Sequence, residues 1–350
     1  MHMSDALISP IVGGVLWAGA AAAAGYSIRK LNKDDLFESK KIPLMGVMGA
    51  FVFSAQMLNF TIPGTGSSGH IAGGLMLAAM LGPYAGFLTI MAVLVIQGLF
   101  FADGGLLAMG CNIINMGFFS CLIAYPLIFK PMLKKGMGAG RITLAAVAAS
   151  VVGLQLGAFS VVIETLLSSR TELPFGTFVL MMQPIHLAIG VVEGLITAAV
   201  LVFLKSVQPE SVTGLQPVAT GSGMPKKAIA IVAALALVCG GALSWFASAY
   251  PDGLEWSMIK TAGTAELEST SGVHEALGQV QESTAFMPDY AFKASEPASG
   301  EAQEAEAPWP AVDAGTSVAG IVGGGATLAI AGLIGLLLYL PKRRKKQAAA

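Results

Sequence analysis

The sequence predicts an all-α integral membrane protein, and its composition and glycine content both support that fold class. Of the 350 residues, 55% are hydrophobic and only 12% are charged, and the mean hydropathy is +0.72. A soluble domain carries roughly 25% charged residues. The 43 glycines suit helices that pack closely in lipid, because small residues let two backbones approach one another.

Long apolar runs in the chain predict about nine membrane helices. These helices are expected near residues 6–28, 42–60, 70–82, 84–101, 111–129, 142–166, 184–204, 228–249 and 318–340. The third is short, and Gly82-Pro83 after it indicates a tight turn or a re-entrant arrangement buried in protein. The three cysteines, Cys111, Cys121 and Cys239, fall in apolar helices and imply no disulfide framework.

Positive charges alternate between the segments that join these helices. Segments 29–41, 130–141, 205–227 and 342–346 hold seventeen of the 20 lysines and arginines. The other three are Arg170, Lys260 and Lys293. Because basic loops stay on the cytoplasmic side, we expect a multi-pass protein of a prokaryotic cell membrane with its amino terminus outside and its carboxyl terminus in the cytoplasm.

A linker divides the chain into two units. Residues 206–227 are rich in Pro, Gly, Ser and Thr and predict a cytoplasmic linker. The linker separates a seven-helix unit, 1–205, from a two-helix unit, 228–341, and a basic cytoplasmic tail, 342–350, follows. The tail is expected to anchor the topology and to contact anionic lipid. Nothing in the charge distribution indicates a nucleic-acid partner.

Segment 250–317, between the last two expected helices, is acidic and should lie outside the membrane. It carries twelve acids from Asp252 to Asp313 against two lysines. This composition predicts a solvated spacer that is disordered over 297–310. The alternative is an acidic surface that weakly concentrates cations near a metal port.

Met1-His2 is a potential metal chelate. The α-amine, the His2 amide nitrogen and His2 Nδ1 can fill three corners of a planar site through fused five- and six-membered rings. Tetragonal nitrogen geometry suits Ni²⁺ or Cu²⁺ rather than Zn²⁺ or Mg²⁺. Initiator Met is kept before a bulky residue, and no basic n-region with a cleavage site follows, so we expect this end to remain intact. The alternative is that Met-His is simply how the chain starts.

His70 would add one more nitrogen donor on the same face of the membrane. It follows loop 61–69, whose glycines and proline indicate a shaped turn. An interface histidine is the alternative interpretation of His70. Residues that are expected to orient the imidazole rings or otherwise support the ligands are Asp5, Ser67, Asp103, Asn112 and Asn115.

Other polar residues in the apolar regions rank below this set. Cys111 could act as a soft ligand, although a buried structural cysteine is the stronger interpretation. His186 begins the seventh expected helix, and His274 lies in the acidic segment. Glu164 and Glu193 are ionisable residues within expected spans, which favours a polar interior role or a pairing near a helix end.

Three motifs resemble the substrate-capture subunit of nickel and cobalt energy-coupling-factor (ECF) transporters, the CbiM/NikM family. They are MHMSDALISP, GTGSSGHIAGGLMLAAMLGPYAGF and QGLFFADGGLLAMGCNIINMG, and the similarity covers most of residues 1–205. The PDGLEW stretch at 251–256 is similar to the small NikN/PDGLE-type accessory component, which is fused here behind the linker.

The resemblance implies a seven-helix ECF S-component bundle with two additional helices, partnered by a transmembrane coupling (T) subunit and cytoplasmic ATPases. It also implies that the metal ligands are the Met1 amine, the His2 amide and imidazole, and the His70 imidazole. The start MHMSDALISP is closer to the nickel branch than to the cobalt branch, whose start has a Met-His-Ile-Met-Glu-Gly pattern. This favours nickel without excluding cobalt.

We therefore expect uptake of Ni²⁺, or of Co²⁺, as a transported ligand, with no catalytic cofactor. The alternative is a cobalt-uptake subunit that serves cobalamin synthesis. An intramembrane metalloenzyme is disfavoured because the chain has no HExxH motif and its four histidines are scattered. A stand-alone channel is disfavoured because the helices are largely apolar all round. The sequence has no phosphate-binding loop motif, so we expect a transporter subunit, not an enzyme, with ATP hydrolysed by another chain.

Overall fold

The chain folds as an all-α membrane protein, as predicted. The structure is a computed structural model that describes residues 1–33, 41–207, 226–268, 271–293 and 309–348. Among these residues, six helical segments are long and apolar enough to cross a membrane. Five of them are single helices: α1 (Pro10–Lys33), α4 (Pro83–Phe100), α7 (Ala139–Leu167), α8 (Phe175–Val207) and α12 (Ala314–Ala348). The sixth is a continuous run of three elements: α5 (Met109–Asn112), η2 (Ile113–Phe129) and α6 (Lys130–Leu133).

Two shorter apolar helices complete the bundle in the described part of the chain. They are α2 (Lys41–Gln56) and α9 (Lys226–Gly241), and a short 3-10 helix, η3 (Leu243–Phe246), follows α9. Both α9 and α12 pack against α2, so helices on either side of the expected linker share one bundle. Large apolar side chains such as Ile11 and Leu180 are 79% and 66% exposed, as lipid-facing residues of spanning helices should be.

The third expected helix is much shorter than predicted. The α3 helix covers only Gly74–Leu81, about 12 Å at 1.5 Å per residue, whereas the membrane core is about 30 Å thick. All eight of its residues are buried, and residues 70–73 before it are not helical. The apolar run therefore combines a half-helix with an irregular segment, which is tolerated at this depth because protein surrounds it.

A β-hairpin replaces the end of the second expected helix. Strands β1 (Phe60–Ile62) and β2 (Ser67–Gly69) pair antiparallel, with Phe60 opposite Gly69. The turn between them places Gly64 and Gly66 at φ values of 76° and 72°, a left-handed conformation that glycine adopts without strain. The hairpin leads directly into His70.

The described part of segment 250–317 is folded, so the solvated-spacer prediction is wrong there. It forms α10 (Gly253–Ala262), α11 (Gly272–Thr284) and the short η4 (Pro288–Tyr290). Composition misled the prediction because a few apolar residues, Leu254 and Met258 among them, are buried against the bundle. Most of the expected disordered stretch 297–310, and most of the expected linker 206–227, lie outside the described residues.

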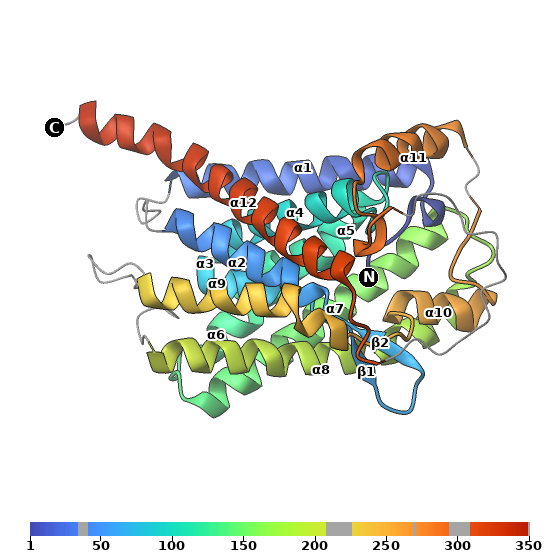
Figure 1. Cartoon of the computed structure of the whole chain (residues 1–350), viewed down its shortest axis with the longest axis horizontal. Coiled ribbons are helices and arrows are strands. Elements are labelled where there is room, and N and C mark those ends of the chain that lie inside the picture. The colour runs from blue at the N-terminus through green and yellow to red at the C-terminus, as the bar shows by residue number, and fades with distance from the viewer. Residues whose placement is uncertain (34–40, 208–225, 269–270, 294–308, 349–350) are drawn as a thin grey trace.

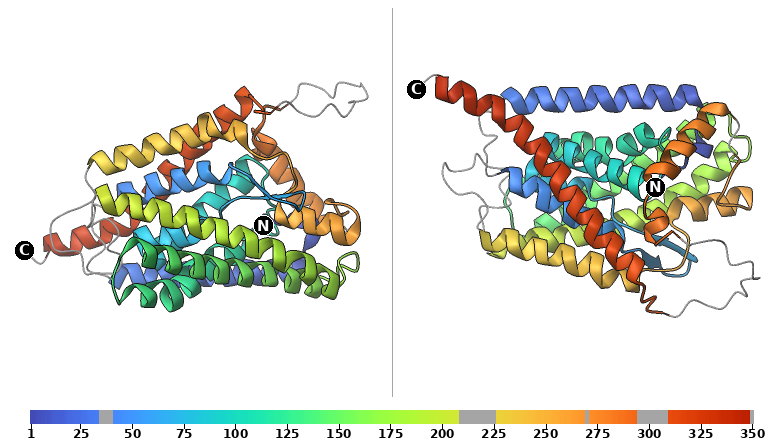
Figure 2. Two further views of the ribbon diagram at one scale, coloured as in Figure 1. Left: turned by 90° about the horizontal axis from the view of Figure 1, so that it is seen from below. Right: turned by 45° about the horizontal axis from the view of Figure 1, so that its top comes forward.

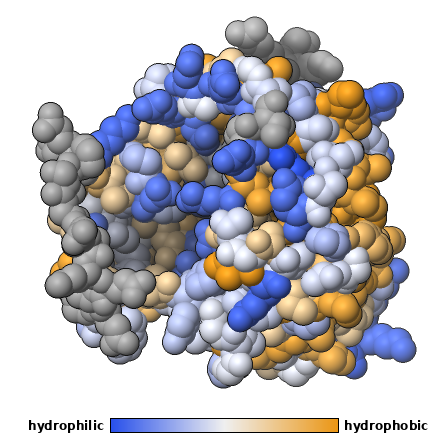
Figure 3. All heavy atoms as spheres, turned by 90° about the vertical axis from the view of Figure 1, so that its right-hand side faces the viewer, coloured by the Kyte–Doolittle hydropathy of each residue, from blue (hydrophilic) through white to orange (hydrophobic). Residues whose placement is uncertain are grey.

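The amino terminus lies toward the same end of the bundle as the hairpin, α10 and α11, whereas α12 carries the carboxyl terminus to the opposite end (Figure 1). Two further views show α12 crossing the neighbouring helices obliquely (Figure 2). Polar residues cover much of the amino-terminal end, and apolar residues border it along one side (Figure 3). This end carries the residues predicted to bind metal.

Candidate metal centre

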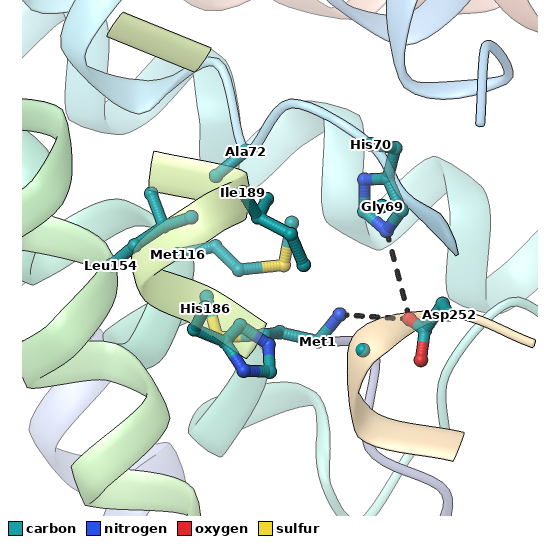
Figure 4. A pocket seen from close by; sticks show the side chains of 10 residues that line it. Met1, Gly69, His70, Ala72, Met116, Leu154, His186, Ile189 and Asp252 are labelled. Carbon is teal, nitrogen blue, oxygen red and sulfur yellow. Dashed lines mark hydrogen bonds and ion pairs between the residues drawn. The ribbon is translucent and has the colours of Figure 1, made fainter. Parts of the chain in front are cut away.

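Met1, His2 and His70 meet in one buried cluster, although His70 lies far along the chain from the other two. Met1 is 6% exposed, and its amino nitrogen lies 3.1 Å from Asp252 Oδ2. The His2 and His70 rings stack with their centroids 5.1 Å apart and their planes at 22°. The close-up shows the Met1 amine and the His70 ring both directed toward Asp252 (Figure 4).

The amino-terminal segment is held by its backbone. Asn112 accepts a hydrogen bond from Met3 N at 2.8 Å and donates one to Met3 O at 3.2 Å. Gly105 N also donates to Met3 O, at 2.8 Å. Asp5 follows in the short helix η1 (Asp5–Leu7), and its Oδ1 accepts from Ala108 N at 3.0 Å. These bonds tie both sides of Met3 to the loop after α4, so Met1 and His2 project into the cluster.

His70 is fixed by the segments on either side of it. Before it, Ser68 N donates to Pro251 O at 2.8 Å, which docks β2 on the chain entering α10. After it, Ala72 N and Gly73 N donate to the two carboxylate oxygens of Glu193 at 2.8 and 3.2 Å. Glu193 thereby satisfies backbone donors at the start of α3, where a negative charge is favourable.

The His70 ring presents Nε2 to the cluster. Its Nδ1 lies 3.1 Å from Ile71 O, and since a carbonyl oxygen can only accept, Nδ1 carries the proton. Nε2 then bears a lone pair and lies 3.9 Å from Asp252 Oδ2. Burial, reinforced by the nearby Met1 amine, lowers the pKa of His70 to about 4. The ring is therefore neutral near pH 7 and suited to bind a cation.

The His2 ring presents Nδ1. Its Nε2 lies 3.3 Å from Gln97 Oε1, while Gln97 Nε2 donates to Gln56 Oε1 at 2.9 Å and to Tyr290 Oη at 3.2 Å. Because the Gln97 amide nitrogen is used by those two acceptors, its oxygen faces His2 and accepts the Nε2 proton. Burial also lowers the pKa of His2. With the proton on Nε2, the lone pair is on Nδ1, the atom that a Met1-His2 chelate needs.

Asp103 is a second acceptor beside the His2 ring. Its Oδ1 is 3.4 Å from His2 Nδ1, and its Oδ2 accepts a 2.5 Å hydrogen bond from Tyr290 Oη. Tyr290 is half-buried, and loss of water around its hydroxyl together with Asp103 raises the pKa of that hydroxyl well above the usual value. The hydroxyl therefore stays protonated and holds Asp103 in place.

Asp252 faces two of the expected donors at once. Its Oδ2 contacts the Met1 amine and points toward His70, and its Oδ1 accepts from Leu254 N and Glu255 N at the start of α10. Burial would raise the pKa of this carboxyl, but the Met1 amine and the other hydrogen bonds hold it well below its ordinary value. Asp252 is therefore ionised at neutral pH.

A small cavity borders the cluster. Its volume is about 10 Å³, close to the smallest volume that can hold one water molecule. Its lining includes Met1, His70, His186 and Asp252. His186 is buried, and its Nδ1 donates to Met182 O at 2.8 Å. Its Nε2 has no hydrogen-bond partner among the described atoms.

The cluster does not rest on side chains alone. Across the described residues, no group of three or more His, Cys, Asp and Glu side chains is arranged to hold a metal ion. The chelate that the sequence predicts draws on two main-chain nitrogens, the Met1 amine and the His2 amide, besides the two imidazoles.

The remaining predicted residues lie near the cluster without touching an imidazole. Asn115 Nδ2 donates to Glu164 Oε2 at 2.8 Å and lies 3.6 Å from Met3 Sδ. Cys111 is a buried free thiol. Ser67 Oγ lies within 3.4 Å of Pro251 O, so Ser67 supports the chain before Asp252. Asn112 and Asn115 thus position Met3 in this structure rather than a histidine ring.

Comparison with known proteins identifies the family of the chain. Residues 2–211 match the cobalt uptake substrate-specific transmembrane region, CbiM, and residues 226–340 match the PDGLE domain. The first match covers more than half of the chain. The chain belongs to this family.

Relatives of this CbiM-family chain are named as nickel and as cobalt transport proteins. A protein of Archaeoglobus fulgidus assigned as a fused nickel transport protein NikMN is 34% identical over 238 residues, which cover 68% of this chain and 75% of that one. The cobalt transport protein CbiM of Geobacter sulfurreducens is 30% identical over 248 residues, 68% of this chain and 69% of that one. The crystal structure of a truncated transition metal transporter superposes with a TM-score of 0.52 at 29% identity, covering 59% of this chain and 99% of that one.

Three residues of the cluster were not predicted as site residues from the sequence: Gln97, Asp252 and Tyr290. Gln97 lies inside an apolar helix, where an isolated amide gives only a weak signal. Asp252 and Tyr290 lie in a segment whose acidic composition suggested solvent exposure. The PDGLE motif itself was the available signal for Asp252, since an Asp followed three residues later by Glu predicts a capped helix.

Proposed function

We propose that this chain is the metal-capturing membrane subunit of an ECF-type importer for Ni²⁺, with Co²⁺ as the alternative substrate. The Met1 amine, the His2 amide, His2 Nδ1 and His70 Nε2 bind the ion on the extracytoplasmic face. A coupling subunit and separate ATPases supply the energy for release into the cytoplasm. The chain itself performs no catalysis.

The observation that carries this proposal is the meeting of the Met1 amine, His2 and His70 in one buried cluster. Gln97 Oε1 and the Ile71 carbonyl lie where each can accept a ring proton, and with the protons there His2 Nδ1 and His70 Nε2 are the lone-pair donors that the planar site requires. Second partners of this kind commonly orient metal-binding histidines. In the structure His2 Nδ1 still faces Asp103 and the two rings stack, so binding requires the His2 ring to turn toward the Met1 amine.

The orientation in the membrane is part of the proposal. The basic ends of the helices, including the Lys33 end of α1 and the Lys205 end of α8, are expected in the cytoplasm. The cluster lies toward the other end of the bundle (Figure 1), which would face outward. An ion could then reach it without crossing the bilayer.

Metal binding by the purified chain tests the proposal. We expect H70A to lose at least tenfold in Ni²⁺ affinity in an equilibrium titration, because one of four donors is gone. E275Q is the control, since Glu275 is exposed and lies outside the donor set. Wild-type affinity in H70A would contradict the proposal. Ni²⁺ flux into liposomes without ATPase partners would instead favour a channel.

The cobalt alternative has a specific basis, because the Geobacter relative is named a cobalt transport protein. Competition between Ni²⁺ and Co²⁺ for the same chain distinguishes the two. A planar site with a deprotonated amide should prefer Ni²⁺.

A further inference from the structure

We propose that Asp252 is a fifth ligand of the bound metal ion, with its Oδ2 at the apex above the planar nitrogen set. This inference rests on the proposed function. It adds a carboxylate from the PDGLE unit to a site otherwise built from Met1, His2 and His70.

The position of Oδ2 relative to the expected donors fits an apical ligand. Metal–donor bonds of about 2.0–2.2 Å that meet at a right angle place the two donor atoms about 3 Å apart. Oδ2 lies 3.1 Å from the Met1 nitrogen. It lies 3.9 Å from His70 Nε2, so these two atoms must approach each other by about 1 Å to reach the spacing of two donors on one metal ion. The close-up shows this oxygen between the two nitrogens (Figure 4).

The carboxylate is aimed by the helix that it caps. Oδ1 accepts from Leu254 N and Glu255 N at 2.8 and 2.9 Å, and Asp252 N donates to Glu255 Oε2 at 3.0 Å. This reciprocal capping box occupies one oxygen and fixes the plane of the group. The other oxygen is left for the cluster.

The backbone around Asp252 is locked to the strand before His70. Ser68 N donates to Pro251 O, and Ser68 Oγ donates to Tyr250 O at 2.7 Å. On the other side, a Cβ at Gly253 would lie 2.8 Å from Ile189 Cδ1 and 3.1 Å from His186 Cε1, so a larger residue would push α10 away from α8. The glycine therefore permits the approach that brings the carboxylate to His70.

Charge balance also favours a bond to the ion. A metal-bound amine has given up its proton, so binding removes the ammonium that Asp252 contacts. The carboxylate is only 16% exposed, and a buried carboxylate without a positive partner is unfavourable. The metal ion, which takes the place of that ammonium, is the cation available to Oδ2.

A fifth donor changes the electronic state of nickel. Planar Ni²⁺ with four strong nitrogen ligands is diamagnetic, whereas an apical oxygen makes it five-coordinate and paramagnetic. A carboxylate oxygen also lessens the preference for Ni²⁺ over Co²⁺, because Co²⁺ has less preference for a planar site. The spin state of bound nickel therefore reports on Asp252 directly.

The test compares Ni²⁺-loaded full-length chains by solution magnetic susceptibility. D252N is the informative variant, because Asn caps helices as well as Asp while its amide is a poor ligand. E255Q is the matched control, since Gln retains the capping box and only a neighbouring charge is lost. We expect wild type and E255Q to be paramagnetic and D252N to be diamagnetic, with the Ni²⁺-to-Co²⁺ affinity ratio rising at least tenfold in D252N.

A diamagnetic wild type, or the same spin state in D252N as in wild type, would overturn the proposal. If D252N binds no Ni²⁺, the nickel X-ray absorption spectrum of the wild-type chain gives the number of donor atoms around the ion. Five donors support the proposal, and four overturn it. H70A separates this inference from the proposed function. If H70A loses Ni²⁺ binding while D252N keeps the wild-type spin state, only the fifth ligand is ruled out. If H70A binds Ni²⁺ as tightly as wild type, both the fifth ligand and the proposed function are ruled out.

Discussion

At the scale of single residues, two oxygen atoms decide which nitrogen each site histidine presents. The Ile71 carbonyl lies against His70 Nδ1, and the Gln97 amide oxygen lies against His2 Nε2. Each can accept a ring proton, which leaves the opposite ring nitrogen as an electron-pair donor. The sequence predicts that Met1, His2 and His70 lie together, and the structure brings them together. Gln97 could not be predicted, because its role exists only once α4 packs beside His2.

Removing the Gln97 acceptor should weaken metal binding without unfolding the chain. Q97L removes the acceptor for the His2 Nε2 proton, so the tautomer with its lone pair on Nδ1 loses its support, and the loss of such a partner typically costs about 10–100-fold in affinity. A Ni²⁺ titration against a coloured chelator measures this. Q155L is the control, since it removes another helix-borne glutamine, whose amide bonds Gln183 O. Equal affinities for Q97L and Q155L would refute the role of Gln97.

The neutral state of His70 predicts a pH dependence of stability. Its pKa is about 4 in the folded chain against 6.5 in the unfolded one, so the unfolded chain binds more protons between these values. Stability is therefore full above about pH 6.5 and falls as the pH drops toward 4, by about 3 kcal/mol from this residue. The melting temperature of metal-free wild type should fall over this window, and that of H70Q should fall less. Parallel curves for the two chains would count against a neutral His70.

At the scale of elements, the irregular segment before α3 lets a histidine reach the interior. Residues 70–73 are not helical, and the Glu193 carboxylate accepts hydrogen bonds from two of their amides. The hydropathy of 70–82 could not reveal this, because an apolar extended segment and an apolar helix have the same hydropathy. The spans α1, α4, α7, α8 and α12 were predictable because their apolar runs have 18 or more residues, about the length of a membrane-spanning helix.

Glu193 should matter for both stability and metal binding. E193Q offers one acceptor oxygen where two backbone donors need one each, and an unsatisfied buried donor costs about 1–3 kcal/mol. We expect a lower melting temperature in detergent and weaker Ni²⁺ binding. T197A is the control from the same helix, because the Thr197 hydroxyl is buried and has no hydrogen-bond partner among the described atoms. If E193Q melts and binds like T197A, the segment does not depend on this carboxylate.

At the scale of the whole molecule, the described part of segment 250–317 packs over the amino terminus. His274 Nε2 bonds Ile8 O at 2.9 Å, and Gln281 Nε2 donates to Gly98 O and Gly104 O at 2.8 and 2.7 Å. Asp252 and Tyr290 add contacts to the cluster itself. Composition alone could not predict this docking, because these contacts involve a few polar side chains in a segment that otherwise reads as solvated.

The docking of α11 should restrain the amino-terminal segment. H274A removes the bond to Ile8, so amide hydrogen exchange should speed up over residues 2–8. E275Q, next to it and exposed, should leave exchange unchanged. Equal protection of residues 2–8 in both variants would show that His274 does not hold them.

The most direct test is Ni²⁺ binding by the H2Q variant. The substitution removes the imidazole that closes the six-membered ring, while Met1 is still kept before a bulky residue and the other predicted donor, His70, is untouched. S4A keeps the first three residues and serves as the control. We predict that equilibrium Ni²⁺ affinity falls by at least a hundredfold in H2Q and stays at the wild-type value in S4A. Unchanged affinity in H2Q would contradict the central claim that the amino-terminal Met-His pair is the ligand.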